Sequence, residues 1–504
     1  MTTGTASKRE GTFVWPVSRR RAIGQTVRLL VKGTAIGDEL RFEQDVEHLK
    51  LGSRRFLVLG HPDLIDRVLY TNRTNYVKSA EFEPLRALTG LNLLTDEGES
   101  WAYHRGELNS VFSRRRLDDL VDLVADPIVD YADELSAHPG RVEFDIHEDM
   151  VGLTLRVVAN ALFSQDFGDL IDRMHDLVTA GLRRAEVMDR LGMVGAFTPR
   201  GWSLLAKIAY QPVPLPPPLR EFQRIARGME QGIQSILDER ARTPSQRRDL
   251  LDQLIEADGG TWPRKRIRDE ALTFVLAGHE TTANALSWFW YLLAINPDAR
   301  ARMLEEIDRV LGQRPPTAPD LHELPYTTAC IQESQRYFSA VYALPRTAQE
   351  DDWIGPHFVP AGTTVIMPSH RIHHDERWWP EPAEFRPERF LTRNPNRPRS
   401  AYLPFGGGRR VCIGQSFALM EMVLVAAVLS QRFTFDLVPG YPVEPEPTLT
   451  LRPKHGIRVV ARRRSGPPGD PAAAAQSEPD PAEAAARCPV STDDLPTEEQ
   501  PEAL

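Results

Sequence analysis

The chain has 504 residues, enough for a large buried core, and its 41% hydrophobic and 26% charged residues are typical of a globular protein. Of its formal net charge of −9, the stretch from Ser465 onward, with nine acidic residues and one Arg, carries −8, so the rest is nearly neutral. We expect no nucleic-acid partner. Its three cysteines lie far apart and form no disulfide framework, and the mixed charges between Arg21 and Leu40 exclude a bilayer-spanning segment there. We therefore expect a cytoplasmic monomer without a transmembrane anchor.

The first half of the chain predicts mostly helices. We expect an N-terminal segment at 1–39, then one large domain over 40–464. A strand-like run at 55–59 precedes a short helix at 62–70, and the spacing of apolar residues is helical over 101–135. Further helices are predicted at 151–163, 170–193 and 219–237, with a stiff Pro-rich connector at 212–218.

The longest predicted helix runs from Arg264 to Ile295. Pro263 stands just before it, and Asn296-Pro297 ends it. At about 1.5 Å per residue it would be roughly 50 Å long and would cross a whole domain. Helices at 297–311 and 326–338 follow, and short alternating runs at 352–365 and 433–462 indicate strands. The sequence thus predicts a mainly α protein with a small β portion, α+β by strict class.

The long helix carries the run Ala277-Gly-His-Glu-Thr-Thr282. A glycine and two β-branched threonines weaken a helix interior, and a threonine hydroxyl can bond back to a carbonyl and bend the helix. Taken alone, this run is a packing notch.

Two other patterns carry little weight alone. Glu333 and Arg336 share one helix face, but such a pair is usually solvated surface charge. His370, His373 and His374 have a spacing that suggests metal ligands, but we favour a structural role for them.

A single cysteine, Cys412, lies in the glycine-rich frame Phe405-Gly-Gly-Gly-Arg-Arg-Val-Cys-Ile-Gly414. Glycines allow a large cofactor to approach the backbone, and Arg410 supplies a forked cation two residues before the sulfur. A helix predicted from Ile413 to Ala427 would turn its N–H groups toward the sulfur and favour the thiolate. The frame is no dinucleotide fingerprint, because the third glycine would fall on Val411.

The chain ends in a Pro- and Ala-rich stretch with nine acidic residues and one Arg from Ser465 onward. Such a composition cannot bury enough apolar surface to fold, so we expect a disordered acidic extension at 465–504. Cys488 within it is interpreted as an incidental thiol.

The cysteine frame matches F-x-x-G-x-R-x-C-x-G at every fixed position and resembles the haem loop of the cytochrome P450 superfamily. The other motifs follow in that family's order over about residues 40–464. The runs 155–164 and 271–290 look closest to an uncharacterised mycobacterial branch. The supporting motifs are Trp101-x-x-x-Arg105, Ala277–Thr282, Glu333-x-x-Arg336 and Phe385–Phe390.

This resemblance implies a cytochrome P450 fold, one large domain around a long central helix, with haem b bound through Cys412. Glu333, Arg336 and Arg389 would form a buried structural triad behind the haem loop. The residues implied in cofactor binding are Cys412, Trp101, Arg105, Arg346, Phe405, Gly406, Arg410 and Gly414.

The resemblance also implies a monooxygenase that uses O2, with Glu280 relaying protons and Thr281 orienting water. The chain has no flavin or iron–sulfur segment, so we expect electrons from a separate ferredoxin and ferredoxin reductase, docked near Arg409 and Arg114–Arg116. The substrate would be lipophilic, of the fatty acid, terpenoid or sterol class. The predicted pocket residues are Phe82, Leu88, Leu91, Phe274, Ala277, Val341, Leu344 and Leu449.

Three alternatives remain open at this point. A haem-thiolate peroxygenase or isomerase would need no reductase, but the intact Glu280-Thr281 pair argues against it. A haem-based ligand sensor would show no turnover with a reductase, and a zinc-binding module would be identified by metal analysis.

Overall fold

The computed structural model describes Val17 and residues 45–51, 54–79, 82–138, 142–164, 217–243 and 248–464. The helix expected at 170–193 and the extension at 465–504 lie outside the described residues, as do most of the segment 1–39 and of the connector 212–218.

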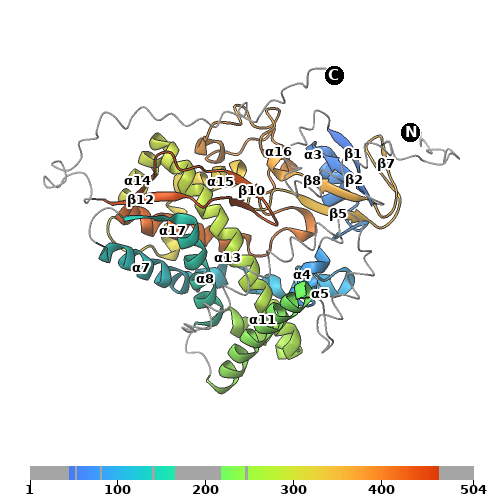
Figure 1. The fold of residues 1–504 in the computed structure, drawn as a ribbon, viewed down its shortest axis with the longest axis horizontal. Helices are drawn as coiled ribbons and strands as arrows, with labels where there is room; N and C mark the ends of the chain where they lie inside the picture. The colour runs from blue at the N-terminus through green and yellow to red at the C-terminus, as the bar shows by residue number, and fades with distance from the viewer. Residues whose placement is uncertain are drawn as a thin grey trace.

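The described helices surround one long element, α13, which begins at Arg264 and ends at Ile295 as predicted and crosses the middle of the molecule (Figure 1). Pro263 precedes its first turn, and Pro297 begins the next helix. The other helices are α3 (Pro62–Asp66), α4 (Glu83–Thr89), α5 (Gly98–Val111), α6 (Arg114–Asp118), α7 (Val121–Ala137), α8 (Ile146–Phe163), α11 (Pro217–Arg242), α12 (Leu250–Glu256), α14 (Pro297–Leu311), α15 (Pro325–Tyr337), α16 (Ser369–His373) and α17 (Gln415–Arg432).

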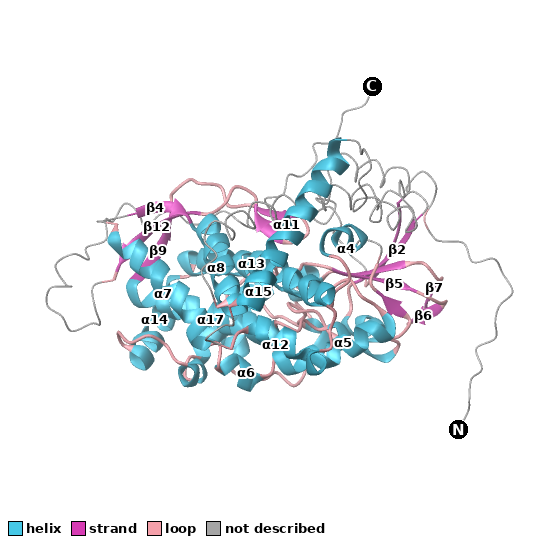
Figure 2. Cartoon of the chain, turned by 90° about the horizontal axis from the view of Figure 1, so that it is seen from below, coloured by secondary structure: helices cyan, strands magenta, loops and turns pink. Residues whose placement is uncertain are grey.

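The two larger sheets lie at opposite ends of the helical body, as Figure 2 shows. The largest has the order β1-β2-β8-β5-β3, in which β2 and β8 are parallel and the other pairs antiparallel. A second sheet has the order β4-β12-β9, and two hairpins pair β6 with β7 and β10 with β11. The strands are β1 (Val46–Leu51), β2 (Arg54–Leu59), β3 (Tyr76–Val77), β4 (Val142–Asp145), β5 (Leu344–Ala348), β6 (Asp352–Ile354), β7 (His357–Val359), β8 (Thr364–Met367), β9 (Phe433–Leu437), β10 (Pro445–Pro447), β11 (Leu451–Pro453) and β12 (Arg458–Arg463).

The main core lies between α13 and its neighbours α8 and α17. Gly278 permits close packing there, because a Cβ atom at this position would lie 2.9 Å from a methyl group of Val158 on α8. Trp288, fully buried on α13, stacks on Phe338 with 4.1 Å between ring centroids. The packing notch considered for the run 277–282 is therefore present, and it brings α8 close to the centre of α13.

One predicted helical region divides into three. The interval 101–135 contains α5, α6 and α7, because the chain leaves the helical conformation at Phe112 and Ser113 is extended at the start of α6. Within the described residues, every helix is either too short or too polar to cross a bilayer.

Candidate active site

The loop that carries Cys412 is shaped by glycines. Gly406 and Gly408 have φ of 72° and 68°, in the left-handed region, and the Cys412 amide donates to the Phe405 carbonyl at 2.9 Å. A Cβ atom on Gly408 would lie 2.1 Å from the carbonyl oxygen of Leu69, which belongs to the single π-helical turn η2 (Arg67–Thr71). The loop therefore fits against η2 only with glycine at position 408.

The Cys412 side chain is exposed, yet the surrounding protein raises the pKa of its thiol by desolvation. The Gly414 amide, the Arg105 guanidinium and the Lys78 ammonium oppose that rise in the pKa of Cys412, so the site offers partners for a thiolate.

Helix α17, which follows the cysteine loop, meets α13 near the middle of that helix. Cys412 lies three residues before α17, and Glu421 on α17 faces Thr282 on α13. The Glu421 carboxyl is fully buried, and burial raises its pKa well above the usual value. It makes no hydrogen bond of standard geometry within the described residues, although the nearby Thr282 hydroxyl partly opposes the rise in pKa.

Three cations gather beside the cysteine loop. Desolvation, together with the charge of Arg410, lowers the pKa of Arg346 to about 10. Desolvation also lowers the pKa of Lys78 well below its usual value, and Arg346 and Arg410 add to this effect. Glu97, which pairs with Arg410, is the carboxylate that partly offsets both shifts. The cluster is therefore short of negative charge. Lys78 was missed by the sequence reasoning, because no recognised motif includes it.

Arg410 has a free donor directed into the protein. Its Nη2 atom donates to the Asp96 carbonyl at 2.8 Å, and its guanidinium lies 3.9 Å from the ring centroid of Trp101. Its Nη1 atom is buried without a hydrogen-bond partner among the described residues. Arg105 donates to the Asn109 side chain at 3.1 Å, and its charge is felt at Cys412. The predicted residues Trp101, Arg105, Arg346 and Arg410 thus lie around one loop.

The motif of the long helix leaves part of α13 accessible. Ala277 is exposed although α13 crosses the centre of the protein, and the Thr281 hydroxyl donates to the Ala277 carbonyl at 2.6 Å. The Glu280 carboxylate, on the same helix, accepts a hydrogen bond from the Thr450 hydroxyl at 2.8 Å. His279, by contrast, is 1% exposed and packs within the helix bundle.

The predicted triad is assembled as expected. The Glu333 carboxylate accepts hydrogen bonds from Arg336 at 2.8 Å from both Nε and Nη2, and from Arg389 Nε at 3.2 Å. Glu333 and Arg336 are both 0% exposed, so the surface-pair interpretation is wrong. Arg389 lies on the short turn η6 (Pro387–Phe390), which packs against α15.

The histidines have structural contacts. The Leu403 amide donates to His373 Nε2 at 2.8 Å, and the His373 carbonyl accepts from Arg336 at 2.9 Å. The His374 ring contacts the His370 ring, with 4.3 Å between their centroids. Across the described ranges, no three His, Cys, Asp or Glu side chains gather as metal ligands.

The predicted pocket residues differ in how much of each side chain is exposed. Phe274, Val341 and Leu344 are half-buried, as is Phe82, whose ring lies 3.9 Å from Lys78 Nζ. Leu91 and Leu449 are 36% and 43% exposed. Leu88 is instead 1% exposed within the core, so its place on a pocket wall stays a prediction.

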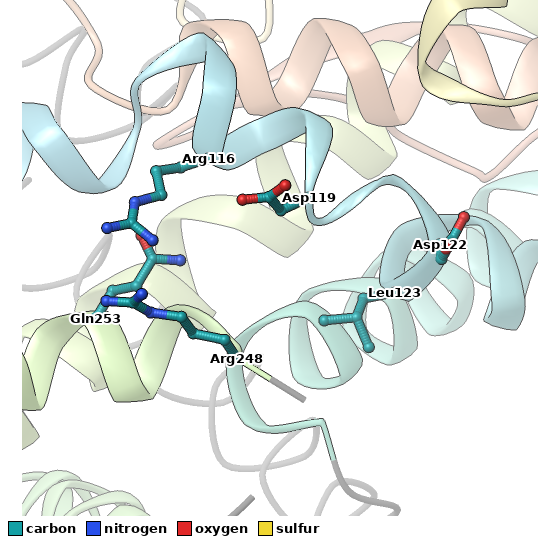
Figure 3. A pocket seen from close by; sticks show the side chains of 6 residues that line it. All are labelled: Arg116, Asp119, Asp122, Leu123, Arg248 and Gln253. Atoms are coloured by element: carbon teal, nitrogen blue, oxygen red, sulfur yellow. The ribbon is translucent and has the colours of Figure 1, made fainter. Parts of the chain in front are cut away.

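A separate hollow of about 330 Å³ lies between α6, α7 and α12, as Figure 3 shows. Its lining mixes two arginines with two aspartates and therefore has no single sign of charge. Two neighbouring arginines of the run 114–116 therefore have different surroundings: Arg116 lines the hollow, and Arg115 is exposed. The lining residues are Arg116, Asp119, Asp122, Leu123, Arg248 and Gln253.

Comparisons with known proteins agree on one family. The family model described as cytochrome P450 matches residues 41–460. Cytochrome P450 132 of Mycobacterium tuberculosis is 60% identical over 420 residues, which cover 83% of this chain and 90% of that protein. Cyclooctat-9-en-7-ol 5-monooxygenase of Streptomyces melanosporofaciens is 31% identical, covering 83% of this chain and 88% of that protein. A crystal structure of a P450DA haem domain aligns with a TM-score of 0.75 at 22% identity, covering 88% of this chain and 95% of the other.

Proposed function

Because the chain belongs to the cytochrome P450 family, and is therefore a haem-containing monooxygenase that uses O2, we propose that Cys412 binds the haem iron and that the substrate is a lipophilic small molecule. The observation that carries this proposal is the accessible Cys412 thiol beside buried cations that lack enough negative charge.

The residues around the cysteine fit a haem. The two carboxylates of a haem would supply the negative charge that Lys78, Arg346 and Arg410 lack, and the buried Nη1 of Arg410 offers a donor without a partner in the described part of the chain. We propose that these three cations, with Trp101 and Arg105, hold the haem, while Phe405, Gly406 and Gly414 shape the loop. When bound, the haem supplies the redox-active iron at which dioxygen is activated.

The protein's own part in the reaction is to deliver protons and exclude water. Glu280 would carry protons toward the haem site, and the Thr281 hydroxyl would hold a water beside the Ala277 carbonyl. The half-buried apolar side chains Phe274, Val341 and Leu344 would exclude bulk water from the substrate. This arrangement favours a monooxygenase over a peroxygenase or isomerase, because those reactions do not require a relay of this kind.

For the substrate we propose the fatty acid, terpenoid or sterol class. The apolar residues predicted to line the pocket support this proposal, and one Streptomyces relative is named for oxidising a hydrophobic alkenol at position 5. A spectral binding screen of the purified holoenzyme against a library of these three lipid classes and of polar compounds of similar size tests it. A high-spin shift with one class identifies the substrate class, and shifts only with polar compounds would contradict the proposal.

Removing the Thr281 hydroxyl should uncouple electron use from product. We expect Thr281→Ala to retain haem and NADPH oxidation. It should release several-fold more hydrogen peroxide per NADPH, because the water that the Thr281 hydroxyl would hold beside the Ala277 carbonyl is lost. Peroxide and NADPH are measured together with the best lipid from the screen. Thr281→Ser, which keeps the hydroxyl, is the matched control, and equal peroxide release in all three proteins would remove Thr281 from the mechanism.

We propose that an acidic electron carrier of the ferredoxin type, served by a separate reductase, docks near the cysteine loop. Arg115 and Arg409 are exposed, and α6, which carries Arg115, packs against α17 just beyond Cys412. Arg114 was also predicted to lie at this docking site, but its side chain is not among those that the structure describes.

If docking is electrostatic, reduction by a plant-type ferredoxin should weaken with salt and with charge reversal. We expect Arg115→Glu with Arg409→Glu to slow stopped-flow reduction by roughly tenfold or more. Arg220→Glu with Arg242→Glu on α11 is the matched control, because it reverses two exposed arginines on another helix. Reduction rates that ignore both salt and the double substitution would place the carrier elsewhere and would overturn this docking site.

A further inference from the structure

The carboxylate of Glu280 is held by a hydroxyl from a distant part of the chain. Thr450, in the turn between β10 and β11, lies 2.8 Å from Glu280 Oε1 through its Oγ1 atom. The same Oγ1 lies 3.1 Å from Nδ2 of Asn284, which is one helical turn beyond Glu280 on α13. Thr450 therefore joins two residues on the same face of the long helix.

The direction of these hydrogen bonds is fixed by their chemistry. An amide Nδ2 can only donate, so Asn284 donates to the Thr450 oxygen and the single hydroxyl hydrogen of Thr450 points to Glu280. Asn284 is 0% exposed and Thr450 is 5% exposed, so their contact is buried, while the contact between Thr450 and the half-buried Glu280 is partly buried. The hydroxyl thus donates to the Glu280 carboxylate.

The turn that carries Thr450 is itself anchored on both sides. The amide and hydroxyl of Thr448 donate to the Thr450 carbonyl at 3.0 and 2.8 Å. The Leu451 amide donates to the Ala340 carbonyl at 2.9 Å, and Trp288 Nε1 on α13 donates to the Leu451 carbonyl at 2.9 Å. Such anchoring keeps the Thr450 hydroxyl at one place relative to α13.

We propose that Thr450 is a positioning residue for the proton relay: its hydroxyl, oriented by Asn284, fixes where the Glu280 carboxylate stands beside Thr281. This inference rests on the proposed function of Glu280. It assigns a role to a residue of the C-terminal hairpin that no local motif singles out. Its chemistry is that of a charge-assisted hydrogen bond, which is shorter and stronger than a neutral one.

The contact can be measured without a substrate. The difference infrared spectrum between the wild-type holoenzyme and Glu280→Gln identifies the carboxylate stretching bands of Glu280. We expect Thr450→Val to shift these bands, because an accepted hydrogen bond is lost, and Thr450→Ser to restore their positions. Thr328→Val on α15 is the matched control, because its hydroxyl donates to the Leu324 carbonyl, away from the Thr450 turn. We expect it to leave the bands in place.

The functional consequence is tested by a double-mutant cycle. Hydrogen peroxide per NADPH is measured in substrate-free turnover with a plant-type ferredoxin and its reductase. We expect Thr450→Val to raise the peroxide yield in the wild-type background and to add nothing in the Glu280→Gln background, since it acts through Glu280. Haem content confirms that each variant is folded.

Two results would overturn the inference. One is an unshifted set of Glu280 bands in Thr450→Val, and the other is an equal rise in peroxide with and without the Glu280 carboxylate. A different result would overturn the relay itself: if Glu280→Gln leaves the peroxide yield unchanged, Glu280 does not deliver protons, even where the band shift supports its contact with Thr450.

Discussion

Replacing Cys412 by histidine should abolish the red-shifted Soret band of the ferrous–CO complex that marks a thiolate ligand. A thiolate donates electron density to the iron, and histidine cannot replace that donation because its imidazole is a neutral ligand. The structure supplies the thiolate's partners in the Gly414 amide and the charges of Arg105 and Lys78. We expect a complete loss of the band and of monooxygenase activity, measured by carbon monoxide difference spectroscopy on the purified variant.

The other cysteines provide the controls. Cys330 is 0% exposed on α15, and burial raises the pKa of its thiol well above the usual value, so Cys330→Ala should keep the band. Cys488 lies outside the described residues, and Cys488→Ala should behave in the same way. A normal spectrum from Cys412→His would show that another residue binds the iron.

Removing the Glu333 carboxylate should destabilise the protein by about 3–5 kcal/mol, because it leaves buried arginines without their counter-charge. Glu333 accepts from Arg336, from Arg389 and from the Arg386 amide at 2.9 Å, and it is fully buried. We expect Glu333→Ala to express poorly and to bind little haem. Denaturant unfolding of the purified protein measures the stability, and the ratio of Soret to protein absorbance measures haem content.

An exposed ion pair serves as the matched control. Glu134 pairs with Arg156 at 3.1 Å with both side chains largely exposed, and such pairs contribute about 1 kcal/mol or less. Glu134→Ala should therefore retain haem and stability. If Glu333→Ala were as stable and as haem-replete as Glu134→Ala, the triad would not support the fold.

Local signals in the sequence predicted the helices and the cysteine loop well. The spacing of apolar residues and the flanking prolines placed α13 at Arg264–Ile295, and Asn296-Pro297 marked its end. The glycines of the Cys412 frame indicated an open loop, and their positive φ angles bear this out. These features depend on neighbours in the chain, which a sequence displays directly.

Features that depend on distant residues were not predictable in this way. Strands β4 and β5 were missed because each has at most five residues and is defined by its partners in the sheet. Lys78 belongs to the cation cluster only because β3 pairs with β5, which carries Arg346. Thr450 is 170 positions from Glu280, so no spacing rule could join them.

The close fit of Gly408 against Leu69 determines when, during synthesis of the chain, the cysteine loop can fold. Leu69 leaves the ribosome about 340 residues before Gly408, at a synthesis rate of about 5–20 residues per second. The η2 turn therefore waits for many seconds without the loop that covers it. The cysteine loop can reach its final shape only after nearly the whole domain has been synthesised, because contacts so distant in the sequence form late. Haem capture is consequently expected to be a post-translational event, and nascent chains that end before Gly408 should carry no haem.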